Sequence, residues 1–171
     1  CSLNRLSNLI KATGTSCSPS TVMEYVRYLQ ESCLLISIDN YVSKFVEKET
    51  IKKHYFVDNG LLHLFINNPN TSLLENLCAI TLYKKYGKGL YYYNRNIEVD
   101  FYVPDEGLAV QASYQMSDEE TIEREVKALV ALHGLYPLKR AMIITYEDEG
   151  EIVRDGLKIE IRPAWKWVLE C

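Results

Sequence analysis

The sequence predicts an α/β protein in which helices flank a mixed β-sheet, and three observations support this fold class. Apolar residues recur at helical spacing between residues 3 and 33. Short strand-like runs separated by turn residues fill the segment 90–113. A long amphipathic stretch then precedes a buried apolar strand at 140–146, and a strand–helix–strand connection of this kind joins parallel strands.

The composition is ordinary for a globular protein, since 47% of the 171 residues are hydrophobic and 25% are charged. No run approaches the roughly 18 apolar residues that a membrane-spanning helix needs, and no signal-peptide pattern opens the sequence. The five cysteines are scattered without a CxxC pair, which favours a reducing compartment. We therefore expect a cytoplasmic protein that does not associate with a membrane.

Charge is distributed unevenly along the chain. Residues 1–58 carry seven Lys/Arg and six Asp/Glu, whereas residues 59–171 carry twelve and seventeen. Proteins that grip duplex nucleic acid usually present a basic face, so the composition gives little support for that role beyond a local patch. The chain starts at Cys1 and enters a helical pattern at once, from which we expect a fragment of a larger protein.

Two helices are predicted first. One covers residues 3–12 and ends before Gly14, a residue suited to a helix C-cap. Ser18 is the expected N-cap of the other, with Pro19 at its first position. Strand-like segments follow at 34–38, 41–47 and 54–57.

Helix, tight turn, helix and hairpin in this order are typical of a winged helix-turn-helix, whose usual first helix would precede residue 1. We predict such a partial domain over residues 1–66, followed by a linker at 67–71 that is rich in Asn and Pro. The charged residues of the second helix are net acidic, so domain coupling is at least as well supported as DNA binding; they are Glu24, Arg27 and Glu31.

The second predicted domain covers residues 71–171 and contains both helices and strands. Ser117 is the expected N-cap of its long helix, and the segment 147–150 is expected to be an acidic loop. The remaining elements are a helix at 72–86, strands at 90–93, 97–103, 108–113, 140–146 and 157–161, and a terminal helix or strand at 163–171.

Polar side chains alternate on two neighbouring strands of this domain. Glu98 and Asp100 are two residues apart, so a strand places both carboxylates on one face. Gln111 and Ser113 share a face of the next strand in the same way. If the strands pair, one small patch holds two acids, an amide and a hydroxyl, and it is a metal site, the remnant of one, or ordinary surface.

The order of elements, with an acid on the first helix and another on the second strand, resembles the PD-(D/E)XK (restriction endonuclease-like) fold. The C-terminal region of prokaryotic AAA-type ATPases is also similar to this chain, in the segments 21–35, YFVDNGLL at 55–62, LLEN at 73–76, EVDF at 98–101 and PAWKWVLE at 163–170. In that family a P-loop ATPase precedes a winged helix and an uncharacterised nuclease-like domain. No GxxxxGK[ST] motif occurs here, so the resemblance implies that ATP binds only to an upstream ATPase module.

For active members of the nuclease fold, the resemblance implies that a helix Glu and a strand Asp hold Mg²⁺, with an (Asp/Glu)-x-Lys motif on the next strand. Glu75 matches the helix acid and Asp100 the strand acid, which makes them the candidate Mg²⁺ ligands. Gln111 and Ser113 stand where the third motif would have Glu and Lys, so we expect a degenerate site.

Two features would restore activity. Glu98 would serve as an additional ligand, and Lys127 on the following helix would replace the displaced lysine. The leading hypothesis is a non-catalytic accessory region of an AAA-type ATPase, which binds DNA or a protein and couples that partner to the ATPase module. The alternatives are an active Mg²⁺-dependent DNA endonuclease and a protein-interaction scaffold without a nucleic-acid role. The oligomeric state is not predicted.

Overall fold

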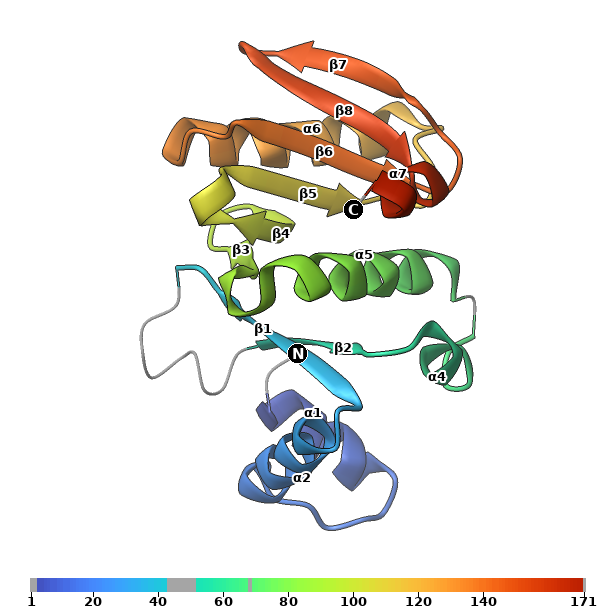
Figure 1. The fold of residues 1–171 in the computed structure, drawn as a ribbon. Helices are drawn as coiled ribbons and strands as arrows, with labels where there is room; N and C mark the ends of the chain where they lie inside the picture. Colours follow the sequence, from blue (N-terminus) through green and yellow to red (C-terminus); the bar gives the residue numbers. More distant parts are fainter. Residues whose placement is uncertain (1–2, 43–51, 68, 171) are drawn as a thin grey trace.

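The computed structural model describes residues 3–42, 52–67 and 69–170. Its described strands form one mixed sheet of eight strands in the order β2-β1-β3-β4-β5-β6-β8-β7, with helices packed on the sheet (Figure 1). This arrangement confirms the predicted α/β class and the mixed sheet flanked by helices. No helix among the described ranges is long and apolar enough to cross a membrane.

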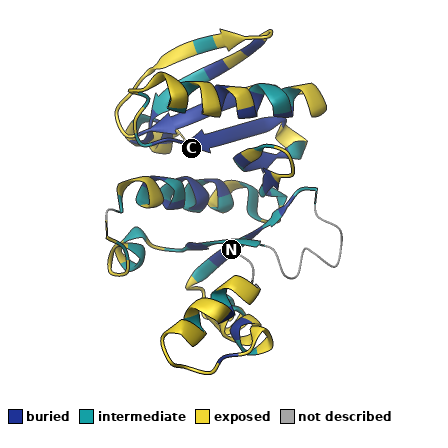
Figure 2. Cartoon of the chain, turned by 180° about the vertical axis from the view of Figure 1, so that it is seen from behind, coloured by how far each residue is buried: buried dark blue, intermediate teal, exposed yellow. Residues whose placement is uncertain are grey.

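The N-terminal helices are α1 (Leu3–Ala12) and α2 (Pro19–Glu31). Ser18 caps α2 as predicted, because its side chain accepts a hydrogen bond from the Thr21 backbone N–H at 3.1 Å. Both helices are mostly exposed, and Val22 is the one buried residue of α2 (Figure 2). They pack against each other and, through α2, against the first strand.

Strands β1 (Leu35–Asn40) and β2 (Lys52–Phe56) form an antiparallel hairpin. Strand β1 then pairs in parallel with β3 (Tyr91–Asn94) through only two residue pairs. The Asn40 side chain reinforces this junction, since its amide donates to the Asn94 carbonyl at 2.7 Å and its oxygen accepts from the Asn94 N–H at 3.0 Å. One sheet therefore spans both predicted domains, 1–66 and 71–171.

The predicted strand 41–47 falls mainly on residues 43–51, which lie outside the described part of the chain. The short helix α4 (Asn59–His63) follows β2. Helix α5 then begins at Asn70, inside the predicted linker, and continues to Tyr86. Short 3₁₀ turns occupy 87–89 and 104–106.

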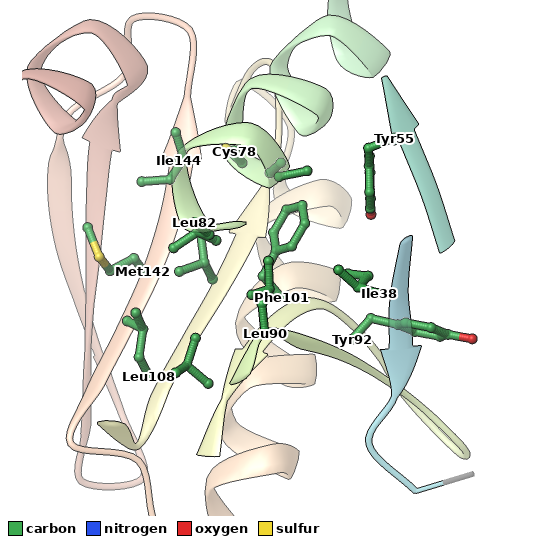
Figure 3. Packing of buried hydrophobic residues seen from close by; sticks show 14 of the residues in the cluster. Ile38, Tyr55, Cys78, Leu82, Leu90, Tyr92, Phe101, Leu108, Met142 and Ile144 are labelled. Carbon is green, nitrogen blue, oxygen red and sulfur yellow. The ribbon is translucent and has the colours of Figure 1, made fainter. Parts of the chain in front are cut away.

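Two apolar layers cover the two faces of the sheet. Helix α5 contributes Leu74, Cys78 and Leu82, which are four residues apart and face the sheet together with α7 (Ala164–Glu170). Figure 3 shows part of this layer around Phe101. Helix α6 (Glu119–Leu135) packs Leu129 and other apolar residues on the opposite face.

The central strands are β4 (Glu98–Val103), β5 (Leu108–Ala112), β6 (Arg140–Thr145) and β8 (Leu157–Pro163). Strand β4 is antiparallel to β5, whereas β5 and β6 are parallel neighbours, as the strand–helix–strand pattern predicts. Strand β8 is also parallel to β6, and β7 lies between them in the chain.

One local prediction was wrong, and one strand was not predicted. Asp118, not Ser117, caps α6, because the Asp118 carboxylate accepts from the Thr121 N–H at 2.8 Å. The predicted acidic loop 147–150 ends in an edge strand, β7 (Gly150–Arg154), which pairs with β8. A turn with positive φ at Asp155 (51°) and Gly156 (79°) closes this hairpin.

Candidate functional site

Three acids from two segments of the chain meet at the ammonium group of one lysine, Lys53 on β2. Its Nζ atom lies 2.9 Å from Glu98 Oε1, 2.9 Å from Asp100 Oδ1 and 3.4 Å from Glu75 Oε1. The acids come from α5 and β4, so the cluster joins the edge hairpin to the centre of the sheet. We call these four residues the acid–lysine cluster.

Strand alternation aims two β2 side chains at the same acid. Lys53 and Tyr55 are two residues apart and share a face of β2, and the Tyr55 hydroxyl donates to Glu75 Oε1 at 2.8 Å. The register of β3 against β4 shifts near Val99, as in a β-bulge. Such irregularities re-aim side chains, and here both Glu98 and Asp100 reach Lys53.

A buried asparagine places α5 beside β2. The Asn76 side-chain oxygen accepts from the Phe56 N–H at 2.8 Å, and its amide donates to the Phe56 carbonyl at 2.9 Å. The same amide also donates to Asn59 Oδ1 at 2.8 Å. Edge strands leave backbone groups unpaired, and Asn76 satisfies those of Phe56 while it holds the neighbouring Glu75 near Lys53.

The environment stabilises the charged form of Lys53. Burial opposes that charge, but attraction to Asp100 and Glu75 and hydrogen bonds to Glu98 and Asp100 raise the pKa of Lys53 well above its ordinary value. Burial, together with the nearby Glu75 and Asp100, also raises the pKa of Tyr55, which keeps its hydroxyl a donor. The cluster therefore holds a permanent internal cation.

The predicted amide belongs to the framework of the site. Gln111 is 3% exposed, its Oε1 atom accepts from the Asp100 N–H at 2.8 Å, and its Nε2 atom donates to the Glu98 carbonyl at 3.1 Å. The Ala112 N–H in turn donates to Asp100 Oδ2 at 3.2 Å. Where β4 and β5 separate, the side chains of Gln111 and Asp100 thus make the hydrogen bonds that backbone groups of paired strands would otherwise make.

A cavity of about 460 Å³ opens beside these acids, and most of the predicted site residues border it. They are Glu75, Glu98, Asp100, Gln111 and Lys127. Ser113 does not line this cavity, because its hydroxyl donates to the Gln115 carbonyl at 3.1 Å and its N–H donates to the Ile144 carbonyl at 2.9 Å. The structure therefore separates Ser113 from the acids with which the sequence grouped it.

One further acid borders the cavity. Glu125 on α6 is 7% exposed and binds Arg124 at 2.7 Å. Burial raises the pKa of Glu125; Arg124 opposes this effect, and the negative charges of Asp100 and Glu98 add to it. Glu125 was not among the site residues predicted from the sequence.

Sequence reasoning also missed Lys53 and Tyr55. Lys53 was not among the predicted site residues, although its two-residue spacing from Tyr55 beside the predicted strand at 54–57 was a usable signal. That spacing predicts a shared face but does not identify which residues the face contacts.

The cluster can be compared with what a metal ion requires. Mg²⁺ prefers about six oxygen ligands at roughly 2.1 Å in octahedral geometry. Glu75 and Asp100 supply suitable oxygens, but both contact the Lys53 ammonium instead. No group of three or more His, Cys, Asp or Glu side chains within 3–42, 52–67 and 69–170 is arranged to hold a metal ion. In this arrangement the residues fit an ammonium group rather than Mg²⁺.

Comparison with known proteins shows a similarity to an archaeal protein. The chain is 31% identical over 183 residues to the uncharacterized protein MJ1544 of Methanocaldococcus jannaschii, and the match covers 98% of this chain. The chain spans 40% of the length of that relative. No family model and no solved structure matches the chain.

Proposed function

We propose that the chain is an accessory region of a larger P-loop ATPase of the AAA type, in which a nuclease-like domain binds a partner rather than hydrolysing DNA. The element order and the acids Glu75 and Asp100 support the nuclease-like assignment by their resemblance to that fold. The relative extends well beyond the matched region, which is compatible with an additional ATPase module. In this proposal ATP binds only to that module.

The acid–lysine cluster carries the non-catalytic part of the proposal. Its ammonium lies within 3.4 Å of an oxygen of each of the three acids, so it occupies oxygens that a metal ion would need as ligands. A divalent cation would therefore have to displace a group whose charge these same acids stabilise. Gln111 stands at the place of the third motif's acid, and its amide forms hydrogen bonds with the β4 backbone.

The N-terminal region supports a partner-binding role. Helices α1 and α2 and the β1–β2 hairpin have the order of a partial winged helix. On α2, Arg27 pairs with Glu31 at 3.6 Å, and Tyr28 donates to Glu24 at 2.7 Å. Phosphate binding would have to compete with these acids, so we favour a protein partner over DNA for this helix.

DNA cleavage tests the main proposal. Plasmid DNA incubated with the protein and Mg²⁺ or Mn²⁺ should stay intact, and Asp100→Ala should behave like the wild type. Asp105→Ala is the matched control, because Asp105 lies exposed on the turn after β4. Cleavage by the wild type and Asp105→Ala that disappears in Asp100→Ala would refute the non-catalytic assignment.

A Mg²⁺-dependent endonuclease is the second candidate, and one observation favours it. Lys127 borders the same cavity as Glu98 and Asp100, so a lysine from α6 accompanies the acids there. This candidate requires Lys53 to leave the acids and predicts that Lys127→Met abolishes cleavage, whereas the non-catalytic proposal predicts no cleavage by either protein.

Binding measurements distinguish the remaining partner classes. A DNA-binding role predicts affinity that falls steeply as salt concentration rises, because phosphate contacts release counterions. The scaffold alternative predicts no salt-sensitive DNA binding at low ionic strength. The sequence of the complete protein, examined for a phosphate loop, tests the ATPase assignment directly.

A further inference from the structure

A second cavity lies where three parallel strands end. Strands β5, β6 and β8 point to the same edge of the sheet, where α7 begins (Figure 1). An aromatic residue follows each strand closely: Tyr114 after β5, Tyr146 after β6 and Trp165 after β8. Ligands of open α/β sheets bind beyond the carboxyl ends of parallel strands, so this edge is a favourable place for a binding site.

The cavity has the size and lining of a small-molecule site. Its volume is about 480 Å³, within the range of roughly 300–1,000 Å³ that small-ligand pockets occupy. Leu73, Leu74 and Leu77 of α5 form one wall, and Val168 and Leu169 of α7 form another. It shares no lining residue with the cavity beside the acid–lysine cluster.

The aromatic residues are partly held in place and partly exposed. The rings of Tyr114 and Tyr146 stack with centroids 5.0 Å apart and an interplanar angle of 17°. A hydrogen bond from the Tyr146 N–H to the Tyr114 carbonyl at 3.2 Å joins their backbones. Tyr146 is 52% exposed and Trp165 is 59% exposed, so apolar and aromatic surface remains open at the mouth.

The acidic loop after β6 places one carboxylate in the lining of the cavity. In the loop after β6, the Asp148 side chain accepts from the Met116 N–H at 2.8 Å, and Glu149 pairs with Lys166. Glu147 lines the cavity, and among the described residues it makes no ion pair. Aromatic faces beside a carboxylate favour an organic cation, because both the ring quadrupole and the negative charge attract it.

We propose that this cavity binds a small organic cation with an aromatic body. The apolar walls take the body, and the ammonium group lies at the mouth between Glu147 and the exposed Tyr146 ring. The Trp165 ring already lies 5.5 Å from the Lys166 ammonium, so it contributes apolar contact to the body. The cavity is separate from the acid–lysine cluster, so this proposal does not depend on whether the chain cleaves DNA.

The test compares a cation with its uncharged isostere. Binding of 1-naphthylmethylamine and of 1-naphthylmethanol to the whole chain is measured by calorimetry at neutral pH. The amine should bind more tightly than the alcohol. Glu147→Gln should weaken binding of the amine by about three- to fivefold, as expected for loss of a solvent-accessible ion pair. The affinity for the alcohol should stay unchanged.

Two further variants give the controls. Trp165→Ala should weaken binding of both probes by about tenfold, because the aromatic wall contacts the naphthyl group that both probes carry. Glu106→Gln, on the exposed turn after β4, should change neither. Equal affinity for amine and alcohol, an unchanged amine affinity in Glu147→Gln, or no measurable binding of the amine would each overturn the proposal. Circular dichroism confirms that the variants are folded.

Discussion

The central strands β4–β6 and the β1–β2 hairpin belong to one sheet but are held by different interactions. Apolar side chains bury the central strands on both faces, and Val99, Ile143 and Ile144 are fully enclosed. Two residue pairs attach the hairpin to β3, and Ile36, Ile38 and Tyr55 place one face of it in the apolar layer under α5. Polar side chains complete its attachment: Asn40, Asn76 and Lys53. Apolar burial on both faces therefore dominates the centre, whereas the hairpin combines burial on one face with a few polar contacts.

The largest expected effect comes from emptying the central core. Phe101 is 1% exposed and packs between α5 and the sheet. Phe101→Ala should lower the free energy of unfolding by about 3–5 kcal/mol, because it removes a large apolar side chain and leaves a cavity. Urea denaturation measures the change.

The exposed edge strand offers the control for this variant. Val153 on β7 is 66% exposed, so Val153→Ala should cost about 0.5 kcal/mol or less. Equal losses in the two variants would contradict the assignment of stability to the centre of the sheet.

Removing the cation of the acid–lysine cluster should have the next largest effect. Lys53→Met leaves three close carboxylates without their counter-charge and should cost about 3 kcal/mol. Because the acids are then free to accept another cation, millimolar MgCl₂ should raise the melting temperature of this variant and leave that of the wild type unchanged.

Lys52→Met is the matched control, since Lys52 is next in sequence and pairs with Asp39 at 3.3 Å instead. It should lose less than about 1 kcal/mol and gain no stability from MgCl₂. Stabilisation of the wild type by MgCl₂ to the same extent as Lys53→Met would show that Lys53 does not keep divalent cations out.

Asn76→Ala should lower the free energy of unfolding by about 2 kcal/mol, because the Phe56 backbone groups at the sheet edge lose their hydrogen-bond partners. Amide hydrogen exchange should become faster at Phe56 and in β2 but not in β6. Equally faster exchange in both strands would mean that the hairpin and the centre open together, which would remove the distinction between them.

A loss of stability of similar size should depend on pH and come from His54 in the hairpin. Burial, with a contribution from Lys52, lowers the pKa of His54 to about 4 from its ordinary 6.5, and Ser37 Oγ lies 2.6 Å from its Nδ1. The unfolded chain therefore binds more protons than the folded one between these values, and stability falls as the pH is lowered through this window. The shift corresponds to a loss of about 2 kcal/mol between about pH 7.5 and about pH 5.

Urea denaturation at several pH values checks this, with His54→Gln as the comparison. The variant should lose the His54 contribution, so its stability should depend less on pH in this window. An unchanged pH dependence would show that His54 is not titrating as its burial implies.

Local patterns in the sequence predicted much of the fold. Ser18 before Pro19 predicted the start of α2, and the apolar run after Arg140 predicted β6. Strand β7 was missed because most of its side chains are exposed, so neither a buried run nor an alternating pattern identifies it. Strand β7 forms because it pairs with β8, and its own sequence does not indicate a strand.

Local patterns also predicted part of the candidate site. Glu98 and Asp100 were grouped correctly because they are near each other on one strand. Ser113 was grouped with them by alternation, but its hydroxyl donates to Gln115 instead. Lys53 and Glu125 were missed because they approach the acids from β2 and α6, and no local pattern encodes such distant approaches.

By itself, the sequence determined most of the helices and strands, the parallel crossover and the pairing of two acids on β4, because each depends on residues that are close along the chain. Only the tertiary structure decided which cation those acids meet. Lys53 and Asp100 are 47 residues apart, and their contact exists because an edge hairpin docks beside α5 and turns its lysine inward. Electrostatic attraction acts through space, so the chemistry of this cluster depends on packing that no local pattern contains.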